Sequence, residues 1–388
     1  MNVIVFDLLC SQPVGKVKFH GGGEYTKTVF KFFADSYSGA SKIVACFNKK
    51  KFIDDWLIEM MKAKDIILEQ VESSQDIVDV LSKYKNKNME VRFFAGLAYG
   101  YNGLKFPDNI IKIGTCHGLR AIEKQTDDYL FLYYKSFDLF KEIIKKFLKK
   151  PLYKKYYRTY QSVIRDFDMI LTDSQHSLYS IKLNYSNFIA EKEFYVLYPL
   201  TQLDSENALV SNKVNEEKFI MMISADRWIK NSYRGIMAID DLYEKGLLNG
   251  VKTKVYGNAP DKIKKRIKNI KNFVFYNYVT NEELELAYKN CDIMFYPTLN
   301  EGFGNVSMEA MKYGKTCVIS AICSLPEVYG ESVYYCNPYD IMEIQNRILQ
   351  AIENKISLDC IKQRLDYLNN RQKIDMVRLC NMISGEEI

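Results

Sequence analysis

The fold is decided by the stretch Pro297-Thr-Leu-Asn-Glu301-Gly-Phe-Gly304-Asn-Val-Ser-Met-Glu309-Ala-Met-Lys-Tyr-Gly314. It follows an apolar run, Cys291–Tyr296, that predicts a buried strand, and it passes through a glycine-rich turn into a helical pattern near Asn305. Such a turn presents backbone N–H groups and the positive end of a helix, which suit a phosphate. Carboxylates beside an anion site suit hydrogen bonds to sugar hydroxyls. The stretch therefore predicts a sugar-nucleotide site.

Short apolar runs alternate with helical patterns on both sides of this stretch, as in a parallel sheet covered on both faces. At 388 residues, the chain is long enough for two domains. We expect a first domain over residues 1–200, a polar linker over 201–217, a second domain over 218–357 and a helical tail over 358–388 that crosses back to the first domain. The expected strands are Val3–Leu9, Lys42–Phe47, Asp65–Leu68, Glu90–Phe94, Ile110–Cys116, Met169–Thr172, Phe194–Tyr198, Phe219–Ser224, Lys252–Tyr256, Phe273–Tyr276, Asp292–Tyr296, Thr316–Ser320 and Val333–Tyr335.

Composition argues against several classes of protein. A hydrophobic content of 47% excludes global disorder, and no apolar run reaches the length of about 18 residues that a membrane span needs. The N-terminal residues predict a strand and not a signal peptide. Nine cysteines without CxxC pairs and only three histidines favour reduced thiols and argue against structural zinc. We therefore expect a cytoplasmic protein that needs no metal.

One segment carries a net charge of +7, whereas the whole chain carries +6, so the rest of the chain is about neutral. Eight basic residues and one glutamate lie between Lys141 and Arg158, interleaved with apolar residues at helical spacing, and Pro151 limits or kinks the helix. Two interpretations stay open. The segment is either a peripheral helix on an anionic membrane surface at the inner face of the membrane, or a solvated helix whose apolar side packs on the core. No nucleic-acid partner is expected.

The second half of the chain resembles the nucleotide-binding half of GT-B glycosyltransferases, specifically the large retaining group usually called family four. The resemblance is carried by Glu301-Gly-Phe-Gly-Asn-Val-Ser-Met-Glu309, which fits the Glu-x7-Glu motif of that group. It extends over Thr280–Asp292, Gly314–Ser320 and Leu325–Val328. The resemblance implies an α/β fold of two Rossmann-like domains facing across a cleft. The first domain would lie on the acceptor side, and the second would bind the nucleotide sugar.

The resemblance also implies roles for the residues of the motif. Glu301 would lie by the donor sugar, and Glu309 would bind the ribose hydroxyls. An ordinary helix start with surface glutamates is the alternative. The backbone of the turn would hold sugar and phosphate through Gly302, Phe303, Gly304, Asn305 and Val306.

Further site residues are implied elsewhere in the chain. Arg227 and Lys230 look like the pair that neutralises the donor diphosphate, although the spacing leaves open whether Arg234 takes the place of Lys230. His117 resembles an active-site histidine that bonds a sugar hydroxyl, and a structural histidine is the alternative. Gly22 and Gly23, in His20-Gly-Gly-Gly-Glu24, would contact donor phosphate or acceptor, and a flexible turn explains them nearly as well.

Two aspartates have the appearance of a metal-binding DxD motif, in Asp166-Phe-Asp168. They precede the strand Met169–Thr172 and would therefore lie at the wrong end of the sheet, so we interpret them as structural. Thr172-Asp-Ser174 ends the same strand; it would line the acceptor cleft or cap the following helix.

These patterns together predict a glycosyltransferase of polysaccharide biosynthesis that moves a hexose from a nucleotide-diphosphate sugar to a glycan or lipid-linked acceptor, with retention. Three alternatives remain open. A sugar-nucleotide epimerase would share the fold and need no acceptor, and a non-catalytic partner of another transferase would bind donor without turnover. A glycoside hydrolase would need both glutamates to flank one bond.

Overall fold

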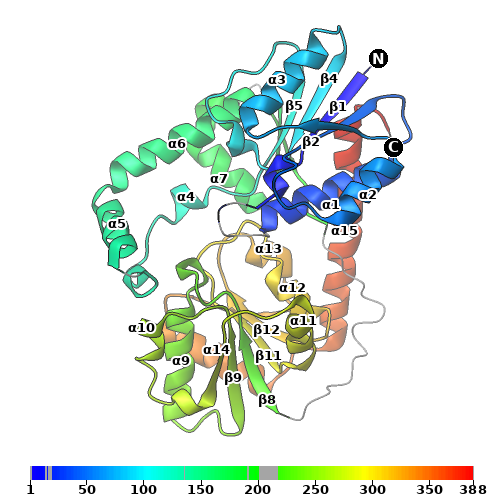
Figure 1. The fold of residues 1–388 in the computed structure, drawn as a ribbon. Coiled ribbons are helices and arrows are strands. Elements are labelled where there is room, and N and C mark those ends of the chain that lie inside the picture. The colour runs from blue at the N-terminus through cyan, green and yellow to red at the C-terminus, as the bar shows by residue number, and fades with distance from the viewer. Residues whose placement is uncertain are drawn as a thin grey trace. The chain divides into compact units, whose positions relative to one another are not determined.

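The computed structural model describes residues 2–13, 15, 20–134, 136–189, 192–200 and 217–387. The chain forms two compact units, each built around one parallel sheet (Figure 1). The first unit holds Met1–Leu119, Lys154–Thr201 and Asn370–Ile388, and the second holds Arg120–Tyr153 and Gln202–Asn369. The expected α/β fold of two Rossmann-like domains is confirmed. The expected domain limits and the cleft stay predictions, and all but one residue of the expected linker, 201–216, lie outside the described residues.

The first unit contains a seven-stranded sheet in the order β3-β2-β1-β4-β5-β6-β7. All its paired strands are parallel. The inner strand β1, which pairs with β2 and β4, is buried almost throughout, which explains its continuous apolar sequence. The strands are β1 (Asn2–Asp7), β2 (Lys42–Phe47), β3 (Ile67–Gln70), β4 (Glu90–Ala95), β5 (Ile111–Cys116), β6 (Met169–Thr172) and β7 (Glu193–Val196).

Helices connect these strands, and part of one core comes from a distant segment of the chain. Phe6 of β1 packs on Phe30 and Phe33 of α1. The same core contains the C-terminal part of α15, whose residues Met376 and Leu379 are only 2% exposed. The helices of this unit are α1 (Gly21–Ser36), α2 (Asp55–Ala63), α3 (Ser74–Lys85), most of α6 (Lys149–Asp166), α7 (Gln175–Tyr185) and the second part of α15 (Leu358–Ser384), with short 3₁₀ helices η1 (Leu9–Ser11), η2 (Ala98–Tyr101) and η4 (Ser186–Phe188).

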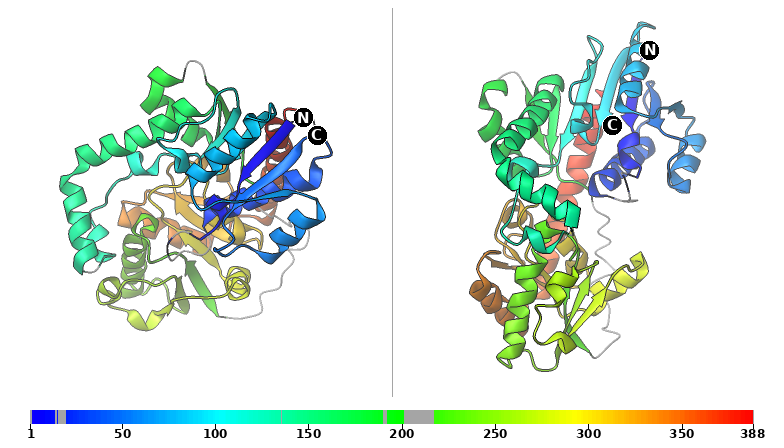
Figure 2. Two further views of the ribbon diagram at one scale, coloured as in Figure 1. Left: turned by 45° about the horizontal axis from the view of Figure 1, so that its top comes forward. Right: turned by 60° about the vertical axis from the view of Figure 1, so that its left-hand side comes forward.

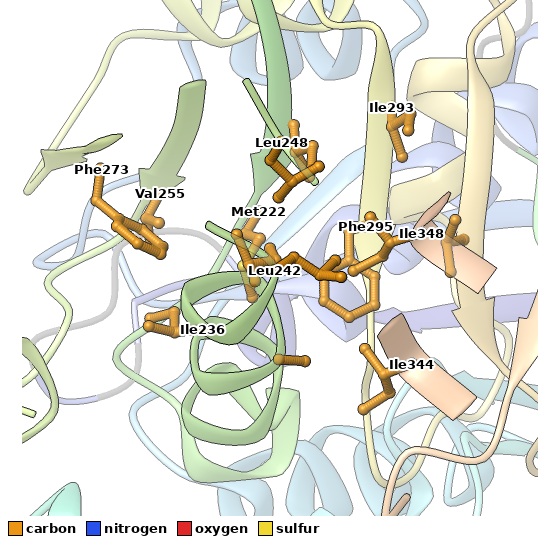
Figure 3. Close-up of a cluster of buried hydrophobic side chains, with 14 of the residues drawn as sticks. Met222, Ile236, Leu242, Leu248, Val255, Phe273, Ile293, Phe295, Ile344 and Ile348 are labelled. Carbon is orange, nitrogen blue, oxygen red and sulfur yellow. The ribbon is translucent and has the colours of Figure 1, made fainter. Parts of the chain in front are cut away.

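The second unit contains a six-stranded sheet in the order β10-β9-β8-β11-β12-β13, again with parallel pairs. Side chains of α9 and α14 pack together with those of the central strands, where Met222, Phe295 and Ile344 are buried (Figure 3). The strands are β8 (Lys218–Met222), β9 (Val251–Tyr256), β10 (Phe273–Tyr276), β11 (Ile293–Tyr296), β12 (Thr316–Ser320) and β13 (Tyr334–Cys336).

The helices of the second unit include a group that precedes α6 in the sequence. Arg120–Tyr153 comes from between β5 and β6 of the first sheet, yet it belongs to the second unit. The helices are α4 (Arg120–Glu123), α5 (Ser136–Phe147), α9 (Ser232–Glu244), α10 (Asp261–Lys264), α11 (Asn281–Asn290), α12 (Val306–Met311), α13 (Leu325–Tyr329), α14 (Ile341–Glu353) and the first part of α15, with 3₁₀ helices η3 (Leu130–Leu132), η5 (Trp228–Lys230) and η6 (Ile270–Asn272).

Several boundaries differ from the expected ones by one or more residues, and two of these differences have a local reason. The strand expected from Asp65 begins at Ile67, because Asp65 has a φ angle of +52° and ends the turn after α2. The sequence of Asp261–Ile270 predicts one continuous helix, but the helix that begins at Asp261 ends at Lys264. The Asp240 carboxylate there accepts hydrogen bonds from the amides of residues 268 and 269, which fixes a turn in the chain.

The basic segment forms parts of two helices. α5 ends at Phe147 and α6 begins at Lys149, so the chain turns at Leu148 (Figure 2). Pro151 lies in the first turn of α6. The backbone N–H groups of a first turn have no partner within the helix, so proline is tolerated there. Within the described residues, no helix combines the length and apolar content that a membrane span requires.

Candidate active site

The glycine turn after β11 is fixed by its backbone conformation and by α13. Gly304 has a φ angle of +94°, and a Cβ atom there would lie 2.4 Å from Cδ2 of Leu325, so this position requires glycine. The Tyr329 hydroxyl donates to the Gly304 carbonyl and accepts a hydrogen bond from the Met308 amide. Ser324 donates to two further carbonyls of the turn, at 3.2 Å each. These contacts hold the turn at the carboxyl end of the sheet.

Three donors converge on one oxygen of the Glu301 carboxylate. Its Oε1 atom lies 2.5 Å from Nζ of Lys230, 2.7 Å from the hydroxyl of Tyr296 and 2.8 Å from the hydroxyl of Thr298. Lys230 also donates to the Tyr296 hydroxyl. The side chains of Lys230 and Glu301 are 7% and 14% exposed. The cluster is a buried ion pair directly after β11, and the carboxyl ends of strands are where α/β sheets bind ligands.

The groups in this cluster shift one another's pKa values. Burial raises the pKa of the Glu301 carboxyl, but the charge of Lys230 and the hydrogen bonds from its three donors lower it more, so the net shift is downward. Burial lowers the pKa of the Lys230 ammonium. Glu301 opposes this effect, and the positive charge of Arg227 lowers the pKa further. Glu301 is therefore held as a carboxylate next to a cation that has lost most of its water.

Two arginines follow β8, and their surroundings differ. Arg227 is exposed just before η5, close enough for its charge to act on Lys230. Arg234, on α9, is buried in an ion pair with Asp127, with Nη1 and Oδ1 3.0 Å apart. Lys230, and not Arg234, makes the contact with Glu301.

The other residues predicted for the donor site lie on the turn and on α12. Glu309 is 39% exposed and forms an ion pair with Lys312, with the charged atoms 2.9 Å apart. Of the remaining turn residues, Phe303 is buried and Asn305 is exposed, whereas Gly302 and Val306 are half-buried. Their contacts with a donor stay predictions.

His117, in the first unit, has both ring nitrogens in hydrogen-bond range of oxygen atoms. Nδ1 lies 3.3 Å from Oδ2 of Asp173, and Nε2 lies 3.0 Å from the carbonyl of Gly96. The ring of Tyr25 packs against it edge-on, with the centroids 4.8 Å apart. Both oxygens are acceptors, so both contacts are hydrogen bonds only when each ring nitrogen bears a proton. A bond from His117 to a sugar hydroxyl, which stays a prediction, would have to replace or share one of these contacts.

The interpretation of the glycines after His20 as a flexible turn is wrong, because they form the first turn of a helix. The helix α1 begins at Gly21, and Nδ1 of His20 accepts a hydrogen bond from the Gly23 amide as its N-cap. A Cβ atom on Gly22 would lie 2.6 Å from Cδ2 of Leu97. Close packing therefore accounts for Gly22, and contact of these glycines with a ligand stays a prediction.

Protein contacts occupy the polar residues around β6. Oδ2 of Asp168 accepts a hydrogen bond from the Lys112 amide at 2.8 Å and pairs with the ammonium of the same lysine. Asp166 pairs with Arg165. Both aspartates thus make ion pairs within the protein, and their structural role stays a prediction. The Ser174 hydroxyl accepts a hydrogen bond from the amide of residue 177, which is the helix cap foreseen for this segment.

Sequence reasoning did not find Tyr296 and Thr298, although both contact Glu301. Tyr296 was assigned to a buried strand, and Thr298 was not singled out. The available signal was their position, because the last residue of a central strand and the loop after it lie at the ligand-binding edge of the sheet.

Residues 204–373 match the family model described as Glycosyl transferases group 1. For that part of the chain, the match supports the expected glycosyltransferase family, whereas the roles of the Glu-x7-Glu motif and the retention of configuration stay predictions. Among curated relatives, the serotype-specific mannosyltransferase WbdA of Escherichia coli is 34% identical over 82 residues. The match covers 21% of this chain and 10% of that relative, so this chain spans about a tenth of its length.

Solved structures resemble the chain over almost its whole length. A sucrose-phosphate synthase from Thermosynechococcus elongatus has a TM-score of 0.69 at 11% identity, over 99% of both chains. Anabaena HepE, in complex with UDP and glucose, has a TM-score of 0.64 at 13% identity, over 99% of this chain and all of the other. At these identities the likeness establishes the fold, which is the GT-B arrangement of two parallel-sheet domains.

Proposed function

We propose that the protein is a glycosyltransferase that moves a hexose from a nucleotide-diphosphate sugar to a glycan or lipid-linked acceptor. The observation that carries this proposal is the buried Lys230–Glu301 pair beside the glycine turn, within a segment that matches glycosyl transferases. A mannosyltransferase among the relatives and a neighbour that holds UDP and glucose favour a hexose and a diphosphate donor. Retention at the anomeric carbon is part of the proposal.

In the proposed reaction, the bond between the anomeric carbon and the diphosphate oxygen breaks, and the nucleoside diphosphate leaves with the electron pair. The acceptor hydroxyl oxygen bonds to the anomeric carbon, and its proton passes to the departing phosphate. Arg227 and Lys230 stabilise the negative charge that develops on the leaving group, in place of a bound metal ion. Glu301 lies by the sugar, and the ammonium of Lys230 is shared between this carboxylate and the diphosphate.

We assign three further ligand contacts. Glu309, which is exposed enough to reach a ligand, accepts hydrogen bonds from the ribose hydroxyls. His117 bonds a hydroxyl of the sugar, and the backbone from Gly302 to Val306 holds sugar and phosphate.

Donor binding is tested by thermal shift and calorimetry of the purified protein with a panel of nucleotide sugars. Glu309→Ala is expected to weaken binding of the preferred donor by about 10- to 150-fold, the equivalent of a charged hydrogen bond of roughly 1.5–3 kcal/mol. Glu285→Ala is the matched control, because Glu285 is also an acid of this unit and pairs with a lysine, Lys289. Unchanged donor affinity in Glu309→Ala would remove the ribose contact, and no binding of any nucleotide sugar would contradict the proposal.

Product analysis separates this activity from its alternatives. With a transferase, the rate at which nucleoside diphosphate is released depends on the concentration of the acceptor, and the sugar appears on the acceptor. Release of an altered sugar without acceptor would identify an epimerase instead. Donor binding without turnover against a panel of glycan and lipid-linked acceptors would identify a non-catalytic partner.

We also propose that the protein associates with an anionic membrane surface through α5 and the start of α6. Phe140, Ile143, Ile144 and Phe147 recur at helical spacing, and Phe140 and Phe147 are 59% and 84% exposed. Their exposure argues against the open alternative in which this apolar side packs on the core. Lysines flank them, and an apolar helix face edged by cations fits the interface of an anionic bilayer.

Cosedimentation with vesicles tests this association. Binding is expected with vesicles that contain phosphatidylserine and not with phosphatidylcholine alone, and Phe147→Ser is expected to reduce it severalfold. Met342→Ser is the control, because Met342 is 79% exposed on α14. Equal loss in both variants, or no binding by the unaltered protein, would contradict the association.

A further inference from the structure

Residues 123–134, which we call the strap, follow β5 in the sequence and belong to the second unit. Its residue Leu132 is 1% exposed and belongs to the core of that unit. Nζ of Lys262 donates to the carbonyls of Phe131 and Tyr134, at 3.1 and 2.8 Å. The Tyr133 hydroxyl accepts a hydrogen bond from the backbone amide of residue 233 at 2.9 Å. The strap is therefore built into the second unit through its core, its backbone and its side chains.

A buried ion pair lies at the centre of the strap. Nη1 of Arg234 lies 3.0 and 3.1 Å from the two carboxylate oxygens of Asp127, and the two side chains are 8% and 5% exposed. The guanidinium lies over the rings of Tyr129 and Tyr339, at 4.6 and 5.2 Å from their centroids. Burial raises the pKa of the Asp127 carboxyl, but Arg234, the backbone amide of Tyr129 and the charge of Lys124 together lower it more, so the pair is charged. Such a pair is costly to break from one side, because the other charge is left buried.

The same guanidinium holds the residue that follows Lys230. Nη1 of Arg234 donates to Oδ1 of Asn231 at 2.9 Å, and Nδ2 of Asn231 donates to the carbonyl of Pro338 at 2.7 Å. Asn231 has a φ angle of +56°, a left-handed conformation that asparagine adopts more readily than most non-glycine residues, and its contacts with Arg234 and Pro338 hold it there. The direction in which the chain leaves Lys230 therefore depends on Arg234.

The strap also contacts the chain next to Glu301. Nδ2 of Asn300 donates to Oε2 of Glu123 at 2.7 Å. The strap thus contacts Asn300, next to Glu301, directly, and Asn231, next to Lys230, through Arg234.

We propose that Asp127 and Arg234 are positioning residues for the donor diphosphate, which act by holding Asn231 and, through it, the ammonium of Lys230. This inference rests on the proposed function, in which Lys230 binds the diphosphate. In this inference Arg234 acts through Nη1, which donates to both Asp127 and Asn231, and not as a ligand of the phosphate. A displacement of the lysine by about 1 Å is enough to lower the rate of a reaction about 100-fold.

The test compares diphosphate with monophosphate ligands by calorimetry on the whole protein. The probes are UDP and GDP, together with UMP and GMP, and the variants are Asp127→Asn and Arg234→Lys. Both variants are expected to bind the preferred nucleoside diphosphate at least about tenfold more weakly than the unaltered protein. Binding of the matching monophosphate is expected to change less than twofold, because it lacks the phosphate that Lys230 contacts.

Asp240→Asn is the matched control. Asp240 is a buried carboxylate on α9, the helix that carries Arg234, and it accepts two backbone hydrogen bonds at 2.8 Å. This variant is expected to lower the melting temperature without a change in the ratio of diphosphate to monophosphate affinity. If Asp127→Asn does not fold, Tyr339→Leu, which removes one ring from the guanidinium, takes its place in the same titrations.

The outcomes separate the two proposals. If the unaltered protein binds the diphosphate and both variants bind it equally well, the positioning role is wrong and the proposed function stands. An equal loss for diphosphate and monophosphate would show that the pair only supports the fold, and would also overturn the positioning role. If the unaltered protein binds none of the nucleotides and no nucleotide sugar, both proposals fail.

Discussion

Tyr296→Phe removes a single oxygen atom from the Glu301 cluster. The lost hydroxyl donates to Oε1 of Glu301 at 2.7 Å and accepts a hydrogen bond from Lys230, and the Tyr296 side chain is 1% exposed. A hydrogen bond to a charged group contributes roughly 1.5–3 kcal/mol, against about 1 kcal/mol for a neutral one. Because water has little access to replace the hydroxyl, we expect the second unit to lose about 2–3 kcal/mol of its free energy of unfolding at pH 7.

The assay uses the two tryptophans of the chain, one in each unit. Trp228 lies in η5 beside the cluster, and Trp56 is 42% exposed in the first unit. In a Trp56→Phe background, fluorescence during urea unfolding reports the second unit alone. Tyr243→Phe is the control, because its buried hydroxyl contacts only neutral groups of residues 251 and 253, and it should cost about 1 kcal/mol.

The pH dependence of the free energy of unfolding provides a second, independent test. The pKa of Glu301 in the folded protein lies below its ordinary value of 4.5, so its contribution to stability is fully present above about pH 4.5 and is lost as the pH falls through the folded pKa. Tyr296→Phe removes one of the hydrogen bonds that lower this pKa, so the folded pKa of Glu301 is higher in the variant. The deficit of the variant should therefore be constant near neutral pH and shrink as the pH falls through the folded pKa of Glu301 in the variant. The reasoning is refuted if Tyr296→Phe costs no more than Tyr243→Phe, or if its deficit is the same at pH 7 and at the lowest pH at which both proteins still fold.

Two other perturbations test how the site and the first unit are held. Gly304→Ala should destabilise the second unit by about 2–4 kcal/mol in urea unfolding, since it meets Leu325 at 2.4 Å in a left-handed conformation. Gly246→Ala, with a φ angle of +72° and no close neighbour, should cost only about 1 kcal/mol, and equal costs would exclude the clash as the cause. Deletion of residues 370–387 removes four buried apolar side chains between residues 376 and 383, worth about 6–12 kcal/mol together, and should unfold the first unit. A native Trp fluorescence signal from that unit after the deletion would contradict this expectation.

Most strands could be predicted from the sequence, because strands that are buried on both faces of a parallel sheet form short continuous apolar runs. Met169–Thr172, Phe273–Tyr276 and Thr316–Ser320 have the expected bounds. The ends of several helices were less predictable. The helix expected to reach Ile270 stops six residues early, because a distant carboxylate, Asp240, competes for its backbone amides.

The candidate site was predictable as a set of residues and not as a set of contacts. The motif and the strand end placed Glu301 and Lys230 in one unit, but nothing in their spacing indicated that they pair with each other. The strap was not foreseen, because chain order assigns residues 120–153 to the first domain. Its link to the second unit depends on the pairing of Asp127 with Arg234, which are 107 residues apart. Such long-range pairs are set by the packing of the finished fold.

The first unit is discontinuous in the sequence, and this determines when it can fold during synthesis. Its core needs residues Met376 to Ile383, which lie more than 250 residues after the end of β5. At about 5–20 residues per second, a ribosome takes roughly 15–50 seconds to reach them after that strand is made. Throughout this interval, the apolar face of the first sheet that α15 covers is without its partner. The nascent chain should therefore be a client of chaperones that shield exposed apolar surface, even though its first strands are among the earliest residues to be made.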